Sequence, residues 1–256
     1  MRQMKRMTLD VWAYKPIGSR TIGADILDVV ATNMRDVFPN LWGFVEPFTT
    51  QASPDNYGDA TELWAEYAER PGAILMGSCD EYNAYVVVCF SAPPARMFNH
   101  FSFRFGAMPI EGDRLEDYLS TFSGVARIVD GEFGRLCLED EWESKNVIKN
   151  YQDADGSINP WAVFCQDIEN GLPGLYWSTY FGKKVWKLLG SADGVARWSL
   201  RDINSGVLAL RSPDPANWKN EAGADGELMN ALRHDWFFDI QKPLNEIKRR
   251  LTSTEL

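Results

Sequence analysis

The sequence predicts an α+β fold, with a largely antiparallel sheet flanked by helices in a single compact domain over residues 1–256. Two observations lead to this prediction. Segments with strand character mostly follow one another along the chain, whereas they would alternate with helices in a parallel sheet. The chain also shows no fixed-period repeat, and its 45% hydrophobic content is ordinary for a globular protein. At 256 residues such a domain buries enough surface to need no disulfide or metal.

The N-terminal region predicts one strand, two helices and a loop. Apolar and polar residues alternate from Met7 to Ala13, which is a strand pattern. From Ile22 to Phe38 apolar residues recur at helical spacing, and Pro39 is expected to end this helix, because the residue before a proline avoids the helical conformation. Residues 46–57 are rich in Pro, Thr, Ser and Asn and predict a loop, and a short helix is expected over 62–69.

The middle of the chain predicts a hairpin, a third strand and a helix. Two apolar runs, Ala73–Gly77 and Ala84–Phe90, are separated by a polar turn, which is typical of a β-hairpin. Phenylalanines alternate with polar residues from Phe101 to Phe105, as in a half-buried strand. A helix is then expected from Asp113, with one apolar face formed by Leu115, Leu119, Phe122 and Ala126.

The C-terminal third predicts further strands and helices. Its expected elements are a strand over Leu175–Phe181, a helix over Lys183–Leu189 that ends at Gly190, a hairpin of Val195–Ile203 and Gly206–Arg211, a helix over Glu227–Phe237 and a last helix from Pro243. Because the hairpin strands flank Asn204-Ser205-Gly206, we expect a tight turn there.

The charge of the chain narrows the classes of partner. The formal net charge is −10 and the pI is about 4.8, so phosphate groups are repelled; we expect no nucleic-acid and no membrane binding. A basic protein remains a suitable partner. Residues 111–156 hold twelve acidic and five basic residues, so most of the excess negative charge lies there.

The candidate partner-binding residues lie within this acidic stretch. They are Glu139, Asp140, Glu141, Trp142 and Glu143, an aromatic residue set among carboxylates. Aromatic side chains are enriched at protein interfaces, and the carboxylates would attract a basic surface. The alternative is that these residues form an exposed acidic turn that only contacts water.

The sequence shows no recognisable catalytic set, and we expect the chain not to be an enzyme. Its two histidines, His100 and His234, accompany no known nucleophile motif. The cysteines at 79, 89, 137 and 165 form no close pair and are expected to be reduced and buried, and no metal or cofactor is expected. An enzyme of unrecognised type, such as a hydrolase using a carboxylate or Cys137, stays open as an alternative.

The N-terminus and the hydropathy of the chain predict a cytoplasmic protein. The basic residues near Met1 precede no apolar run of signal-peptide length, since Thr8, Asp10 and Lys15 interrupt it. No stretch approaches the roughly 18 apolar residues of a membrane-spanning helix.

One segment resembles a known family. Residues 171–190 read Gly-Leu-Pro-Gly-Leu-Tyr-Trp-Ser-Thr-Tyr-Phe-Gly followed by a short segment that ends in Gly190, and residues 205–218 include Ser-Gly-Val-Leu and Asp-Pro-Ala-Asn-Trp. This pattern resembles that of bacterial polymorphic-toxin immunity proteins, in particular immunity protein family 52 and the related type VI secretion immunity proteins. Ser205 stands where the family has the first of two glycines.

The resemblance implies a function but no binding residues. Proteins of this kind bind and neutralise a cognate toxin, so the family implies occlusion of a toxin domain as the mechanism. A cytoplasmic immunity protein would further imply a toxin that acts in the cytoplasm. A structural interaction module without any toxin partner is the remaining alternative.

Overall fold

The computed structural model describes most of the chain. The described residues are 5–70, 72–79, 84–91, 98–107, 113–152, 156–163, 171–172, 174–190, 192, 195–232 and 236–237. The helix predicted from Pro243, the cysteine at position 165 and the histidine at position 234 lie outside these residues.

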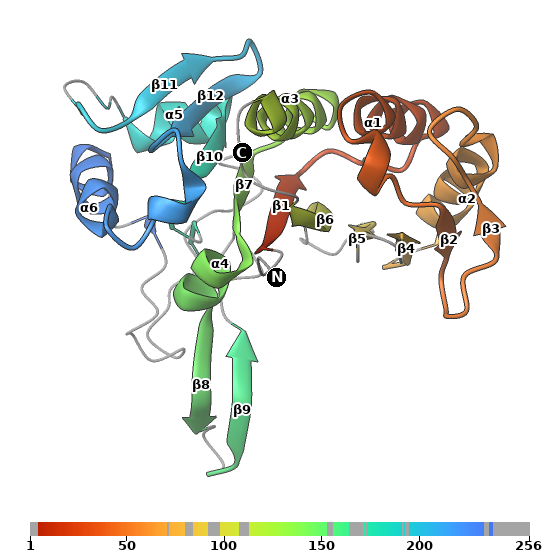
Figure 1. The fold of residues 1–256 in the computed structure, drawn as a ribbon, viewed down its shortest axis with the longest axis horizontal. Helices are drawn as coiled ribbons and strands as arrows, with labels where there is room; N and C mark the ends of the chain where they lie inside the picture. Colours follow the sequence, from red (N-terminus) through yellow and green to blue (C-terminus); the bar gives the residue numbers. More distant parts are fainter. Residues whose placement is uncertain are drawn as a thin grey trace.

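Ten strands form one antiparallel sheet, which confirms the predicted α+β class (Figure 1). The strand order is β11-β12-β10-β7-β1-β6-β5-β4-β2-β3, and all the neighbouring pairs are antiparallel. The strands are β1 (Lys5–Ala13), β2 (Leu41–Gly43), β3 (Thr50–Gln51), β4 (Ile74–Cys79), β5 (Ala84–Cys89), β6 (Asn99–Ala107), β7 (Phe133–Leu138), β10 (Ser178–Gly182), β11 (Ser199–Asp202) and β12 (Gly206–Leu210). The predicted hairpins β4–β5 and β11–β12 are both present.

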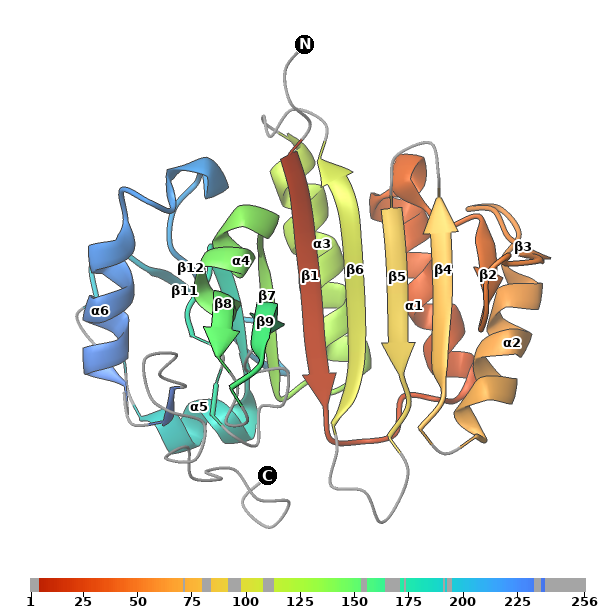
Figure 2. The ribbon, with the colours of Figure 1, turned by 90° about the horizontal axis from the view of Figure 1, so that it is seen from below.

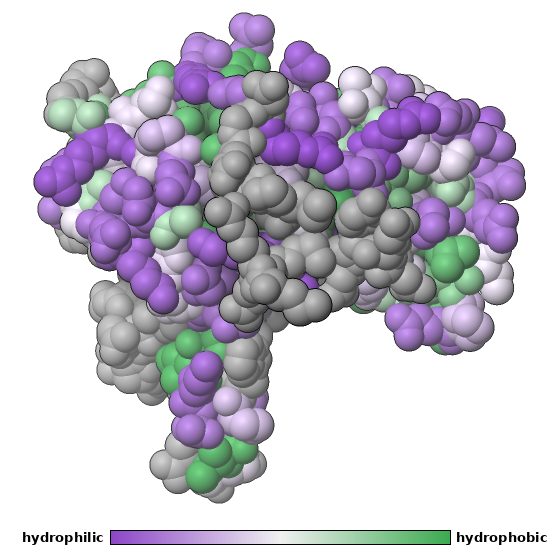
Figure 3. All heavy atoms as spheres, in the orientation of Figure 1, coloured by the Kyte–Doolittle hydropathy of each residue, from purple (hydrophilic) through white to green (hydrophobic). Residues whose placement is uncertain are grey.

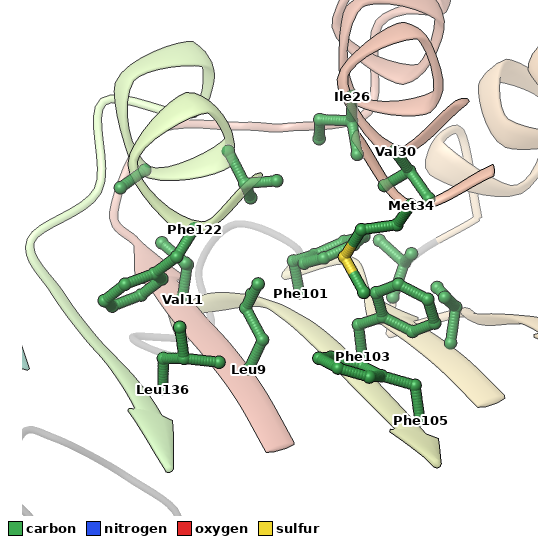
Figure 4. Close-up of a cluster of buried hydrophobic side chains, with 14 of the residues drawn as sticks. Leu9, Val11, Ile26, Val30, Met34, Phe101, Phe103, Phe105, Phe122 and Leu136 are labelled. Atoms are coloured by element: carbon green, nitrogen blue, oxygen red, sulfur yellow. The ribbon is translucent and has the colours of Figure 1, made fainter. Parts of the chain in front are cut away.

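Three helices cover one face of the sheet: α1 (Arg20–Asn33), α2 (Gly58–Ala68) and α3 (Asp113–Ile128). Alternate residues of the strands point toward them. Leu9 and Val11 of β1 and Phe103 of β6 pack with Ile26 and Phe122 from the helices, all fully or almost fully buried (Figure 4). This apolar layer is the main core, and its burial is the principal stabilising contribution to the fold.

Three shorter helices lie near the opposite face: α4 (Glu139–Asn146), α5 (Lys183–Leu189) and α6 (Ala222–Ala231). A second hydrophobic cluster there joins Phe133 of β7 and Phe181 of β10 to Val185 of α5 and Leu228 of α6. This layer covers β7, β10 and β12 and reaches Trp12 of β1. In Figure 2 the strands β1, β6, β5 and β4 face the viewer with no described helix in front of them.

The structure differs from the predicted elements at α1, at α6 and in strands that were not predicted, among them β3 within the expected loop 46–57. The first helix ends at Asn33, because Met34 leaves the helical conformation and a short 3-10 turn follows, with Val37 and Phe38 buried. The helix expected over Glu227–Phe237 is α6, which covers Ala222–Ala231 and does not reach Phe237; Phe237 instead forms a parallel bridge with Leu172. Tertiary pairing therefore overrides the helical pattern of that segment.

One of the strands that the sequence did not predict is β7. All six of its residues are buried, including Arg135, and it pairs with both β1 and β10. A charged residue and Gly134 within six residues hide the strand pattern. The alternation is nevertheless present, since Phe133, Arg135 and Cys137 share one face.

The glycines of the family-like segment have structural roles. Gly182 ends β10 opposite Gly206 of β12, and a Cβ atom at Gly182 would lie 2.3 Å from the carbonyl oxygen of Gly131. Gly190 ends α5 with φ of 98°, a conformation that favours glycine. This pattern therefore reflects close packing of backbone and a helix end, as expected for a fold signature.

A separate two-stranded hairpin, β8 (Val147–Gln152) with β9 (Ile158–Val163), projects from the body of the protein (Figure 1). The sequence did not predict it. Ile158 is 67% exposed, and the hairpin surface carries hydrophobic patches (Figure 3).

Candidate functional site

A pocket of about 590 Å³ lies on the part of the sheet face that the described helices leave uncovered. Its position follows from the fold, because the second layer of helices stops beside β1. The lining side chains come from β1, β5, β6, β7 and α4, together with Phe98 just before β6. They are Asp10, Trp12, Tyr85, Val87, Cys89, Phe98, His100, Ser102, Arg104, Arg135 and Trp142. The site thus combines aromatic, cationic and hydroxyl groups.

Asp10 forms the polar centre of the pocket wall. The strand register places it between Arg135 of β7 and Ser102 of β6. The Nε of Arg135 donates to Asp10 Oδ2 at 2.7 Å, and His100 Nε2 lies 3.0 Å from Asp10 Oδ1. Arg135 also donates from Nη1 to Asn146 and Tyr176, at 3.2 and 3.1 Å. These bonds satisfy the buried ion pair and fix its geometry.

The electrostatics keep Asp10 ionised. Its burial alone would raise the pKa, but the Arg135 charge and the bond from His100 outweigh burial and hold the pKa of Asp10 well below its usual value. An ionised carboxylate only accepts hydrogen bonds, so His100 Nε2 carries the hydrogen and donates it. The imidazole ring is also stacked on Trp12, with ring centroids 4.6 Å apart.

Cys89 is the cysteine that reaches this pocket. It lies directly opposite His100 in the β5–β6 pairing, and His100 in turn contacts Asp10, so a thiol, an imidazole and a carboxylate line the same pocket. Burial, together with the charge of Asp10, raises the pKa of the Cys89 thiol. The thiol is therefore less reactive than a free cysteine, whereas nucleophilic cysteines have lowered pKa values.

Two donors of β6 face the pocket without a partner among the described residues. Ser102 is 7% exposed, and its hydroxyl forms no hydrogen bond there. Arg104 forms no ion pair with any described carboxylate, and its guanidinium lies over the Trp142 ring, 4.9 Å from the centroid. The indole Nε1 of Trp142 is likewise buried without a described acceptor.

The five predicted partner-binding residues lie on α4, and the structure does not place them on one surface. Asp140 is exposed and Glu139 and Glu143 are partly exposed, so these three carboxylates can meet a partner. Trp142 is 8% exposed and borders the pocket, and Glu141 is fully buried. These residues thus form a helix, whereas the alternative to a binding role was an exposed acidic turn, and their role in binding stays a prediction.

Glu141 belongs to an ionic network that is closed in one sense: each of its charged groups has a counter-charge in the chain. Arg211 Nε and Glu221 Oε2 lie 3.4 Å apart in it without a hydrogen bond. The Oε1 of Glu141 accepts from Arg211 Nη2 and Lys145 Nζ, each at 2.8 Å, and its Oε2 accepts from the backbone N–H of Trp177 at 3.2 Å. Asp225 of α6 pairs with both cations, at 2.8 and 2.7 Å. The network fastens α4 to α6, so the Glu141 carboxylate is occupied by contacts within the chain.

The other predicted candidates are distributed over the fold. Cys137 and Cys79 are buried free thiols, and burial followed by the Glu141 charge raises the pKa of Cys137 well above its usual value. Across the described ranges, no group of three or more His, Cys, Asp and Glu is arranged to hold a metal ion. A helix able to cross a membrane is likewise absent from them.

The pocket as a unit is not predictable from the sequence. Asp10, His100 and Arg135 are far apart in the chain, and only the pairing of β6, β1 and β7 brings them together. One signal was present: polar residues interrupt three strands that are otherwise apolar. Polar residues are common on a strand face that contacts solvent, so this signal does not by itself indicate a binding site.

Comparisons with known proteins show a shared fold only. No protein-family profile matches the chain, and no curated protein matches it significantly. Among solved structures, the Pseudomonas aeruginosa T6SS protein PA0821 is similar with a TM-score of 0.53 and 12% sequence identity. The alignment covers 96% of this chain and 78% of that one. At this identity the likeness shows that the two chains share their overall architecture.

Proposed function

We propose that the chain is an immunity protein that binds one cognate secreted toxin in the cytoplasm and blocks it by occlusion. The observation that carries the proposal is the pocket on the uncovered sheet face, where Trp12, Trp142 and Arg104 lie together. Trp, Tyr and Arg are the residue types that dominate the binding energy of protein interfaces. A pocket of this composition on an open surface favours a protein partner.

Two further observations support the toxin setting. Residues 171–190 and 205–218 resemble polymorphic-toxin immunity proteins, and the fold is shared with a protein of a type VI secretion system. The net charge of −10 suits a basic toxin, because carboxylates such as Asp140 would speed association through long-range attraction.

The direct test is co-expression with the product of the adjacent reading frame, followed by co-purification and a growth assay. A 1:1 complex and rescue of growth would support the proposal. Free toxin that inhibits growth equally with and without this chain would contradict it. Cell fractionation adds a check on location, since a periplasmic protein would refute the cytoplasmic part.

A second candidate function rests on Cys89, His100 and Asp10, which line the same pocket. Thiol hydrolases place a carboxylate on an imidazole that takes the proton from a cysteine, and these residue types share the pocket. The raised pKa of Cys89 weighs against it.

Substitution of the thiol separates the two functions. We expect Cys89→Ala to retain toxin binding and protection, because occlusion requires no nucleophile. A folded Cys89→Ala protein that binds the toxin with unchanged affinity but no longer protects cells would favour the thiol enzyme. Cys79→Ala, in β4, is the matched control for the loss of a buried thiol.

A further inference from the structure

The pocket carries hydrogen-bond donors in excess of acceptors. Ser102 and Arg104 are two residues apart on β6, so their side chains leave the same face of the sheet about 7 Å apart along the strand. Neither has a hydrogen-bond or ion-pair partner among the described residues. Ser102 is 7% exposed as a residue and its side chain lines the pocket, so an acceptor bound there would give its hydroxyl a partner.

The charge balance of the pocket is positive, although the whole chain is acidic. Asp10 is neutralised by Arg135 and further bound by His100. Arg104 is then a cation with no described counter-charge, held in place by Trp142 at 4.9 Å. The group that fits beside it is an anion with planar oxygens, because a guanidinium pairs with a carboxylate through two parallel hydrogen bonds.

We propose that this pocket captures the carboxylate of an Asp or Glu side chain that the toxin presents on its docking surface, an inference that rests on the proposed function. Arg104 forms the ion pair, Ser102 donates to a carboxylate oxygen, and the rings of Trp12 and Trp142 pack against the methylene stem. A protein-borne carboxylate is favoured over a free one because a chain of net charge −10 repels small anions in solution. The remaining contacts of the interface place the toxin side chain in the pocket.

The test compares toxin affinity across four variants by calorimetry. Arg104→Met removes the charge and is expected to weaken binding on the order of 100-fold. Arg104→Lys keeps the charge without the planar fork and should lose about tenfold, and Ser102→Ala a similar amount or less. Arg201→Met, on the exposed edge strand β11, is the matched control and should bind as the wild type. Thermal unfolding of each variant checks that it folds.

The toxin side completes the test. Each surface Asp and Glu of the toxin is changed to its amide, and each variant is paired with wild type and Arg104→Met. One toxin carboxylate should show coupling, so that its loss weakens wild-type binding but leaves the Arg104→Met affinity unchanged. A toxin that binds the wild type and Arg104→Met equally well would overturn the carboxylate proposal and leave the immunity function standing. A toxin that binds neither would overturn both.

Discussion

Two buried ionic clusters lie next to α4, and they differ in whether every charged group has a counter-charge among the described residues. The Glu141 network joins Arg211, Lys145 and Asp225, and the Glu141 carboxylate finds donors for both of its oxygens inside the protein. The Asp10 cluster also pairs a carboxylate with an arginine, Arg135, at 2.7 Å. Beside Asp10, however, lie Ser102 and Arg104, which have no hydrogen-bond or ion-pair partner among the described residues.

The difference separates a structural role from a binding role. A buried ion pair adds little stability over an apolar contact, but the loss of one partner is costly because a charge is left uncompensated. The closed network therefore fixes how α4 and α6 sit together. The open cluster fixes the position of its aromatic and polar neighbours and leaves donors for another molecule. Three predictions test this division, in order of expected effect.

The largest effect is expected at the closed network. Glu141→Gln removes the charge that two cations share, so the free energy of unfolding should fall by about 3–5 kcal/mol in urea denaturation. Glu139→Gln on the same helix is the matched control and should change it by less than about 0.5 kcal/mol, since Glu139 is partly exposed and lies 3.8 Å from Arg6. An equal loss of unfolding free energy in Glu141→Gln and Glu139→Gln would contradict the structural role assigned to Glu141.

A smaller, pH-dependent effect is expected at the open cluster. Asp10→Asn should cost about 2–4 kcal/mol at pH 7, because Arg135 loses its buried counter-charge. The folded pKa of Asp10 is depressed, so its contribution is present above the unfolded pKa of about 3.9 and is lost as the pH falls below that value. The difference in unfolding free energy between wild type and Asp10→Asn should therefore be about 1 kcal/mol smaller at pH 3 than at pH 7.

Urea denaturation at both pH values measures this change. Asp130→Asn is the control, because Asp130 is about half exposed and pairs with the exposed Lys15. If the difference in unfolding free energy between wild type and Asp10→Asn stayed constant or increased toward acid pH, the assigned ionisation of Asp10 would be wrong.

The smallest effect on stability is expected on the outer face of α4. Changing the exposed or partly exposed acids to Lys while keeping Glu141 should alter unfolding by less than about 0.5 kcal/mol per site. The association rate with the toxin should fall several-fold at low salt, and the difference should vanish at high salt. The changed residues are Glu139, Asp140 and Glu143, and the control is the α2 triple Asp59, Glu62 and Glu66. If both triple variants slowed association equally, the effect would come from the net charge of the chain and not from the position of the α4 acids.

Much of the fold was determined by the sequence itself. Alternation of apolar residues predicted β1 and β6, helical spacing predicted α1 and α3, and the turn Asn204-Ser205-Gly206 predicted the hairpin of β11 and β12. These signals are local, since they depend on which face of an element is buried and on which residues a turn accepts. The sequence also shows the excess of acidic residues and the segments 171–190 and 205–218 that resemble immunity proteins.

Only the tertiary structure decided which polar residues meet. Asp10, His100 and Arg135 form one cluster because β1 lies between β6 and β7, a pairing that no local pattern contains. The same holds for Glu141. Its acidic neighbours in the sequence suggested a surface position, but in the fold it is buried and pairs with Arg211. Strand order and helix packing are set by contacts between distant segments, so a sequence shows which charges exist, and the fold shows which of them remain available to a partner.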